Sequence, residues 1–568
     1  MRRSTFPGAK SCFCPATSSI VFGLNLSANG EFIFLPALIL TFSAFSLHII
    51  NYTGIWSGKA LKKTIFIKNA LILTVSSLIL RFVGIIFKVW LAQLIGSEGI
   101  GLYQLIFSVY MLAATFATSG ISTAVTRLAA EELALGTKRG TLKILRRAIE
   151  ITLIVAGVTV VTVFFGAEFI AVRFLNDIRA VPALKILPLS LPFMGLSSCL
   201  RGYFIARRKI TPNAVSQLLE QAVRIILIVV LVGNFCTKGL GACAAAVILG
   251  DSAAEIFSFL MLWLIWLRDT KKLDNLTGRN RPPFGIVRRI LHISVPITSG
   301  RYLNTALRTG ENILVPKNLA KYPFGGENAL SQFGMIKGMA LPILFFPSTL
   351  LNAVSTLLIP EISEAEARNR HGLVRSATRN ILKLTSVIAF IFGAIFFVGG
   401  RKIGLLIYKS PEVGELLRAL SPIVPLMYLD SISDGILKGL DQQAFTFRTA
   451  VSDSVLRIIL ILILLPIFGL RGFIWIMYFS NILTCFLNVG RLLHVTRVKI
   501  RFINEILLPL TSATVIAIAC DRLLRLWGGI GNLVYIILLC VISLPLYFGA
   551  MLMFKVVSPD DLRSFLRK

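Results

Sequence analysis

The sequence predicts an all-α polytopic membrane protein of about fourteen transmembrane helices, with two pseudo-symmetric six-helix lobes and two further helices at the C-terminal end. Three observations predict this class. Apolar stretches of about 20 residues recur along the 568-residue chain, each long enough to cross a ~30 Å hydrocarbon core as a helix. Basic residues gather in every second connection between these stretches. The second half of the chain also repeats features of the first.

The composition agrees with a membrane protein. The chain is 55% hydrophobic and only 15% charged, and its mean hydropathy is +0.79. The apolar segments are continuous rather than alternating, which argues against transmembrane strands. We place fourteen core spans near 66–95, 102–126, 148–172, 182–206, 214–234, 240–267, 288–315, 329–359, 380–399, 415–439, 446–469, 472–494, 504–524 and 530–555.

The distribution of charge predicts the topology. A net charge of +32 would suggest a nucleic-acid partner in a soluble protein, but here the cations lie mostly in short connections between spans. The basic clusters occupy alternate connections, at Lys59–Lys68, Lys138–Arg147, Arg207–Lys209, Arg268–Arg281, Arg368–Arg379, Arg497–Arg501 and Arg563–Lys568. Only the segment 400–418 departs from this alternation. By the positive-inside rule we expect a multi-pass protein of the cell membrane with both ends of the fourteen-helix core in the cytoplasm, and no nucleic-acid partner.

Residues 1–60 fit this topology less well. The segment Glu31–Ile50 is apolar enough for one extra span, but that span would place the basic residues Arg2, Arg3 and Lys10 outside the cell. We therefore treat 1–60 as an N-terminal appendage. The eight cysteines are scattered and lack zinc-site spacing, so we expect neither a metal site nor a disulfide framework.

An internal repeat defines the predicted domains. Matched prolines, glycines and charges carry more weight than matched apolar residues, which align easily by chance. An offset of 233 residues aligns Pro192 with Pro425, Gly202 with Gly435, Glu220 with Asp453 and Arg224 with Arg457. Six spans separate equivalent elements, so both copies insert in the same orientation, related by an axis along the membrane normal. We expect an N-lobe at 61–275 (helices 1–6), a C-lobe at 276–500 (helices 7–12), and helices 13–14 with a tail at 501–568.

The repeat also pairs cations inside the spans. An offset of 220 residues aligns Arg81 with Arg301 and Lys88 with Arg308, and Lys337 lies in the next span. Intramembrane charges usually face a protein interior or a water-filled cavity. A cavity lined by these five cations would bind an anion such as phosphate or pyrophosphate, whose oxygens match arginine geometry. The alternative is that these side chains extend to lipid headgroups and only set topology.

A second set of charged residues suggests a gate or a site of ion coupling. Glu220 and Arg224 are spaced i,i+4, as are Asp453 and Arg457, so each pair can form an ion pair within its helix. That simple ion pair, which lowers the cost of insertion, is the alternative to a gate. The candidate gate or coupling residues are Glu220, Arg224, Glu311, Asp430, Asp434, Asp453 and Arg457. Asp430 and Asp434 replace Ser197 and Arg201 of the first half.

The chain contains no HExxH motif, P-loop, nucleophile elbow or paired-cysteine motif. We therefore expect no catalytic residue, no metal and no cofactor, and the protein is not predicted to be an enzyme. Energy for transport would come from Na⁺, from H⁺ or from the membrane potential.

Four stretches resemble a known family: LILRFVGIIFKVWLAQLIGSEGIGLYQLIF (Leu78–Phe107), GISTAVTRLAAEE (Gly120–Glu132), Phe333–Ala367 and Leu426–Gln443. Over about 65–558 the chain resembles the polysaccharide-transport branch of the multidrug/oligosaccharidyl-lipid/polysaccharide (MOP) exporter superfamily. The resemblance implies fourteen helices and movement of undecaprenyl-pyrophosphate-linked precursors across the membrane, including supply of spore-cortex peptidoglycan.

Lipid II flippases of this superfamily carry essential arginines in their first span, and Arg81 matches the first of these. Lys88 follows Arg81 by seven residues, where the pattern has six. The resemblance also implies that the last two helices, at 504–555, form a groove for a lipid tail.

Three functions remain open from the sequence. The first is a flippase for a lipid-linked saccharide that works by alternating access. The second is a cation-coupled multidrug antiporter of the same superfamily, which predicts a cavity dominated by carboxylates. The third is a membrane-embedded glycosyltransferase or polymerase, which needs a larger extramembrane loop than the chain offers. For the first, we expect a monomer whose partners are the lipid-linked saccharide, membrane lipids and cell-wall polymerases.

Overall fold

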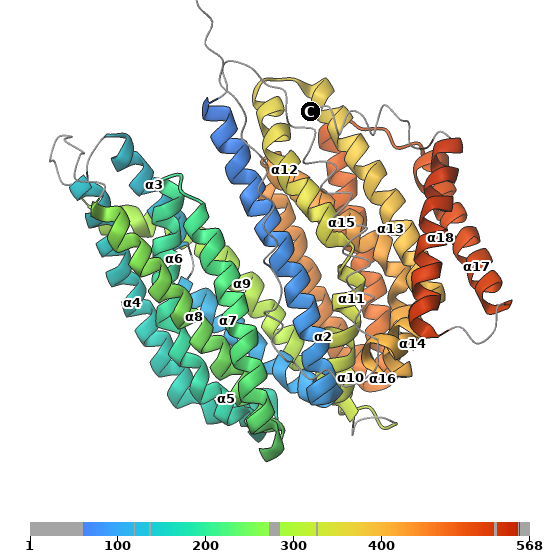
Figure 1. Ribbon diagram of the computed structural model, residues 1–568, viewed down its shortest axis with the longest axis horizontal. Coiled ribbons are helices and arrows are strands. Elements are labelled where there is room, and N and C mark those ends of the chain that lie inside the picture. Colours follow the sequence, from blue (N-terminus) through green and yellow to red (C-terminus); the bar gives the residue numbers. More distant parts are fainter. Residues whose placement is uncertain are drawn as a thin grey trace, which may run out of the picture. The chain divides into compact units, whose positions relative to one another are not determined.

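The computed structural model describes residues 61–118, 120–135, 138–271, 285–324, 328–526, 531–554 and 556 (Figure 1). All of them belong to one structural unit, and every regular element among them is a helix. The predicted appendage at 1–60 and the tail beyond 556 lie outside the described residues.

The longer helices follow in chain order. They are α2 (Leu61–Thr118), α3 (Ile121–Ala134), α4 (Lys138–Phe169), α6 (Leu191–Ala206), α7 (Thr211–Phe235), α8 (Leu240–Lys271), α9 (Ile286–Leu319), α12 (Ser348–Ala367), α13 (His371–Tyr408), α14 (Pro411–Leu420), α15 (Val424–Gly439), α16 (Gln443–Thr496), α17 (Leu508–Leu526) and α18 (Asn532–Met553). Shorter helical segments are η1 (Ile170–Leu175), η2 (Ile178–Ala180), α5 (Val181–Ile186), η3 (Leu187–Ser190), η4 (Cys236–Lys238), α10 (Ala329–Phe333), η6 (Gly334–Ala340), α11 (Leu341–Phe345), η7 (Ser421–Ile423) and η8 (Ile503–Leu507).

Nine helices in the described ranges are long and apolar enough to cross a membrane, which confirms an all-helical polytopic membrane protein. Two of the nine contain a non-helical glycine, Gly96 in α2 and Gly469 in α16. A straight helix of 58 residues, the length of α2, would extend about 87 Å at 1.5 Å per residue, far beyond a bilayer core. Each of these two helices therefore divides into shorter pieces at its glycine. The count of fourteen spans remains a prediction.

Helices α3–α8 group together at the left of Figure 1, α12–α18 group at the right, and α2 and α9 lie between them. In the first group α3 packs against α4 and α6, and α7 packs against α8. In the second, α12 packs against α13 and α15, and α13 also contacts α17 and α18. Helix α2 contacts α9, η6 and α10, while α9 packs along α16.

One cysteine prediction is wrong in part. Cys236 and Cys243 form a disulfide. The short η4 turn between α7 and α8 brings their Cα atoms to 4.4 Å, within the range that a disulfide requires. The spacing of the cysteines gave no sign of this turn. The remaining cysteines of the described part, Cys199, Cys485, Cys520 and Cys540, are free and buried.

Candidate functional site: two buried ion networks and a polar cavity

The first half of the chain contains a buried ion network across three helices. The Arg224 guanidinium on α7 lies 2.8 Å from Glu220, 2.9 Å from Asp251 and 3.6 Å from Glu255, the last two on α8. Arg201 on α6 lies 2.9 Å from the second oxygen of Glu220. The expected i,i+4 pair of Glu220 and Arg224 is thus one contact of a larger cluster, which ties α6, α7 and α8 together.

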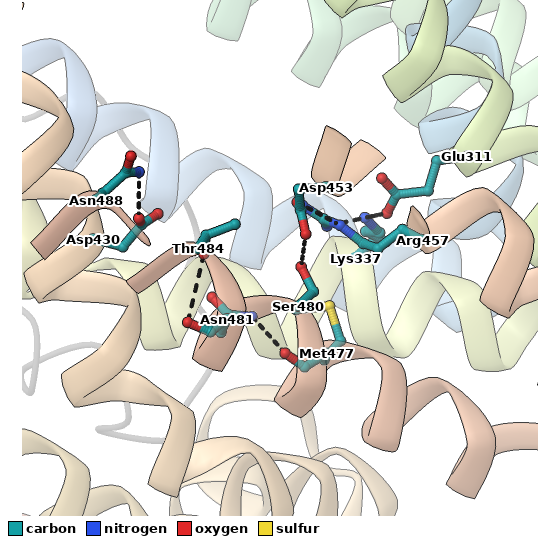
Figure 2. A network of polar contacts seen from close by, with 10 residues as sticks. All are labelled: Glu311, Lys337, Asp430, Asp453, Arg457, Met477, Ser480, Asn481, Thr484 and Asn488. Atoms are coloured by element: carbon teal, nitrogen blue, oxygen red, sulfur yellow. Dashed lines mark hydrogen bonds and ion pairs between the residues drawn. The ribbon is translucent and has the colours of Figure 1, made fainter. Parts of the chain in front are cut away.

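The second half contains a different network, shown in Figure 2. Arg457 on α16 lies 2.5 Å from Asp453 of the same helix and 3.4 Å from Glu311 of α9. Glu311 also accepts a hydrogen bond of 3.0 Å from Lys337 in η6. The Ser480 hydroxyl donates to Asp453 over 2.5 Å. The side chains of Glu311 and Asp453 are only 4% and 5% exposed, so this network joins α9, η6 and α16 inside the protein.

The repeat explains why the two networks differ. The offset of 233 residues places Thr484 at the position of Asp251 and Asn488 at that of Glu255. Arg457 therefore lacks the two α8 carboxylates that surround Arg224. A buried guanidinium is stable only beside counter-charges, and Glu311 of α9 supplies Arg457 with a second carboxylate besides Asp453. The counter-charges of Arg224 thus come from α7 and α8, whereas those of Arg457 come from α16 and α9.

A polar cavity of about 260 Å³ adjoins the first network. Its hydroxyl and charged lining residues are Thr118, Ser122, Thr123, Ser198, Arg201, Glu255 and Arg301. Arg201 and Glu255 come from the network, while Arg301 enters from α9. We call this space the Arg201–Arg301 cavity. The lining contains two guanidinium groups and one carboxylate, Glu255. Its excess of positive charge favours an oxyanion, to which the guanidinium groups and the hydroxyls of Ser122 and Thr123 can donate hydrogen bonds.

A single cavity shared by all five predicted cations stays a prediction. Arg81, Lys88, Arg301 and Arg308 are exposed, and no hydrogen bond or ion pair joins them to other described residues. Only Arg301 lines the Arg201–Arg301 cavity. Lys337 is instead held by Glu311 in the second network.

The remaining predicted residues, Asp430 and Asp434, take different partners. Asp430 accepts a 2.8 Å hydrogen bond from the Asn488 amide, as Figure 2 shows. Asp434 pairs with Lys438 over 2.5 Å, one turn further along α15. The described residues contain no group of three or more His, Cys, Asp or Glu side chains suited to a metal ion.

A tight contact between α2 and the segment after α9 lies at the bottom of Figure 1, beside the label of α10. Gly101 and Gly334 are equivalent positions by the offset of 233, and their backbones meet directly. A Cβ added to Gly334 would lie 2.7 Å from the Gly101 nitrogen, closer than real Cβ atoms approach. The Ser97 and Ser331 hydroxyls add a 2.6 Å hydrogen bond. We call this contact the glycine seal.

Sequence reasoning missed three residues of the site. Asp251 and Glu255 lie inside the span predicted at 240–267, and an ionisable residue inside a span is itself a functional signal. The sequence indicates Arg201 only as the residue of the first half that aligns with Asp434. Asp251 and Glu255 could therefore have been found from the sequence. The position of Arg201 in the lining of the Arg201–Arg301 cavity could not, because it depends on tertiary packing.

Comparison with known proteins adds a family and a fold. Residues 66–325 match the family described as polysaccharide biosynthesis protein. Among solved structures, the chain is similar to the lipid II flippase MurJ in an inward closed conformation, with a TM-score of 0.63 and 16% identity over 86% of this chain and 99% of that one. An inward-facing multidrug resistance MATE transporter of the MOP superfamily gives a TM-score of 0.59 and 16% identity, over 74% and 96%. These likenesses establish the fold.

The curated proteins decide the relationship. The chain is 26% identical over 510 residues to stage V sporulation protein B of Bacillus subtilis (strain 168), which covers 88% of this chain and 98% of that protein. The chain is a homologue of stage V sporulation protein B. It is also 22% identical over 454 residues to the lipid II flippase MurJ of the same organism, covering 75% and 82%. The solved structures that share this fold are described as a lipid II flippase and as a multidrug transporter of the MOP superfamily.

Proposed function

We propose that the protein is a flippase that moves an undecaprenyl-pyrophosphate-linked saccharide, a peptidoglycan precursor for the spore cortex, across the cell membrane by alternating access. The observation that carries the proposal is the Arg201–Arg301 cavity, which is lined by two arginines, four hydroxyls and a single carboxylate, Glu255, that lies 3.6 Å from Arg224. The names of two relatives, stage V sporulation protein B and the lipid II flippase MurJ, support the substrate class.

The charges favour an anionic head group over a cationic drug. A cation antiporter needs carboxylates that are available to its substrate. Here Glu220, Asp251 and Glu255 all lie within ion-pair distance of Arg224, while Arg301 faces the cavity with no ion-pair partner among the described residues. Arginine forks suit the oxygens of a pyrophosphate. The head group would bind in this cavity while the polyprenyl tail stays in lipid, where α17 and α18 are the candidates for a groove.

The glycine seal and the second network support the proposal of alternating access. The seal closes one end of the interface between α2 and η6 and must open for release. The element η6 is a π-helical segment, an irregularity that often occurs at functional sites, and it also carries Lys337. Movement of η6 away from α2 would therefore act on the Lys337–Glu311–Arg457 contacts. These contacts are our candidate for coupling to Na⁺, H⁺ or the membrane potential.

The proposed architecture has fourteen spans, in an N-lobe at 61–275, a C-lobe at 276–500 and helices 13–14 at 501–568. Recurring contacts support the repeat: α3 packs against α4 and α6, as α12 packs against α13 and α15. The disulfide in the turn after α7 supports an extracytoplasmic position for that turn, because disulfides persist in oxidising compartments. Both ends of the core would then lie in the cytoplasm. We propose a monomer that passes its cargo to cell-wall polymerases.

A proteoliposome assay tests the function. Purified full-length protein is reconstituted with fluorescent lipid II, and translocation is followed with and without a membrane potential. Arg301→Gln should lower the rate at least tenfold, because removing one charge-assisted contact costs about 1.5–3 kcal/mol. Arg173→Gln in η1 removes another exposed arginine, one that lies outside the cavity and outside the candidate groove, and serves as the control. Equal rates for both variants would contradict the proposed role of the cavity, and no translocation by the unmodified protein would contradict the proposed substrate.

A further inference from the structure

A second, larger pocket lies between the N-terminal parts of α4 and α9. Its volume is about 910 Å³, and it shares no lining residue with the Arg201–Arg301 cavity. Lys143 and Arg147 line it from α4, and Arg288 and His292 line it from α9. Each pair is spaced i,i+4, so each helix presents two basic side chains on one face. We call this space the α4–α9 pocket.

The basic side chains of this pocket are not neutralised by its own lining. All four are exposed, and no carboxylate is among the lining residues. Arg147 pairs with Glu150 over 2.5 Å but keeps 48% of its side chain exposed. No hydrogen bond or ion pair to Lys143, Arg288 or His292 occurs within the described ranges. At least two full positive charges therefore face the pocket without a protein counter-charge.

Helix stability does not explain the position of these cations. Helices α4 and α9 have no acidic residue in their first turns, although the positive end of the helix dipole favours acidic residues there. Gly285, which precedes α9 and lines the pocket, offers no side-chain cap. Basic side chains in this place add to the unfavourable field. An external anion would compensate both the side chains and the helix N-terminus.

An apolar track leads away from the basic side chains. Val287 and Leu291 on α9 lie in or beside the pocket and are 43% and 42% exposed. Val295 continues the same face, four residues further, and is 55% exposed. These three side chains follow the helix toward the middle of its span. A free phosphate ion would make no use of them, whereas an acyl chain would cover them.

We propose that the α4–α9 pocket binds one anionic phospholipid of the surrounding bilayer. Lys143, Arg147, Arg288 and His292 hold its phosphate, and an acyl chain lies along Val287, Leu291 and Val295. The depth is appropriate, since the pocket is built from the N-terminal parts of two membrane helices, and basic pockets between such helices bind anionic headgroups. Because the lipid contacts α4 and α9 together, it would link two elements that the proposed function assigns to different lobes. The binding itself does not depend on that assignment.

Native mass spectrometry of the full-length protein in detergent tests the site. Phosphatidylglycerol is titrated in parallel with phosphatidylcholine, undecaprenyl phosphate and inorganic phosphate. We expect tighter binding of phosphatidylglycerol than of the other three. Lys143→Gln combined with Arg288→Gln should weaken it roughly 30-fold, from about 1 kcal/mol for each basic residue near an anionic lipid. Arg370→Gln combined with Arg497→Gln removes the same charge from two exposed residues at the ends of α13 and α16, outside the pocket, and should change binding less than about twofold.

Further variants distinguish loss of charge from loss of folding, and a bound lipid from a bound phosphate ion. Lys143→Arg combined with Arg288→Lys keeps the charge and should keep the affinity, which separates loss of charge from loss of folding. Val295→Asn should weaken phosphatidylglycerol but leave any binding of inorganic phosphate unchanged. Equal binding of phosphatidylglycerol and phosphatidylcholine, or equal losses in the pocket and control double variants, would overturn the site. If inorganic phosphate bound as tightly as phosphatidylglycerol, the assignment to a lipid would be overturned. If undecaprenyl phosphate bound more tightly than phosphatidylglycerol, the pocket would be assigned to the transported lipid and the proposal would be wrong.

Discussion

The glycine seal permits a sharp test of alternating access through the substitution Gly334→Ala. The added methyl group would lie 2.7 Å from the Gly101 nitrogen, and the Ser97 carbonyl oxygen would be nearer still. These neighbours are backbone atoms, so no side-chain rotation can relieve the clash. Ordinary contact begins near 3.4 Å and the Ser97 oxygen would be at 2.0 Å, so the two backbones must separate by about 1.4 Å at that point.

The size of the effect follows from this displacement. Overpacking a tight contact costs about 1–3 kcal/mol. In a conformation with the glycine seal open, the two backbones would be apart and this cost would be absent. The ratio of closed to open molecules should therefore drop by about 5- to 150-fold. The variant should fold and insert, because the open conformation contains no clash. Translocation should slow, since each cycle requires the seal to close again.

Cross-linking reports directly on the seal. The Ser97 and Ser331 hydroxyls lie 2.6 Å apart, so Ser97→Cys combined with Ser331→Cys should form a disulfide rapidly under mild oxidation. Adding Gly334→Ala to this pair should lower the yield at a fixed time. Gly157→Ala is the matched control, because a Cβ at Gly157 on α4 has no neighbour within 4 Å.

Two results would refute this reasoning. If Gly334→Ala and Gly157→Ala gave the same cross-linking yield, the backbone contact at Gly101 would not limit closure. If Gly334→Ala lowered the yield but left translocation at the unmodified rate, the seal would close without taking part in the transport cycle.

The ion networks give further predictions, each measured as a melting temperature in detergent against Arg522→Gln as the control. Glu311→Gln leaves Lys337 and Arg457 without their shared carboxylate and should destabilise the protein by about 3–5 kcal/mol. Combining it with Lys337→Met removes one unpaired charge and should recover part of that loss; no recovery would show that Lys337 does not depend on Glu311. Arg224→Gln leaves three carboxylates together and should lower stability at least as much as Glu311→Gln does. A melting temperature equal to that of the control would contradict the importance of this network.

Much of the fold could be predicted because the bilayer constrains it. A segment that crosses hydrocarbon must satisfy its own backbone hydrogen bonds, so a continuous apolar stretch becomes a helix. The predicted spans at 148–172, 214–234 and 240–267 accordingly lie within α4, η1, α7 and α8. Local turns were harder to predict from the sequence. The Cys236–Cys243 disulfide depends on a three-residue 3-10 turn that composition does not indicate.

The candidate site could be predicted only in part. Helical spacing was enough to pair Asp453 with Arg457, because both lie on one helix. It could not show that Glu311, on another helix 146 residues away, completes the coordination of Arg457. Nor could it show which of the matched cations share a cavity, since that depends on how each helix is rotated against its neighbours.

The sequence by itself determined that this protein is helical, crosses the membrane many times and carries charges inside its spans, because hydrophobicity, periodicity and residue spacing are properties of the chain alone. Only the tertiary structure decided which charges meet. It brought Arg301 and Arg201 to one cavity, joined Glu311 to Arg457, and placed Gly101 against Gly334. The physical reason is that such contacts arise between helices distant in sequence, whose packing depends on all of their side chains together.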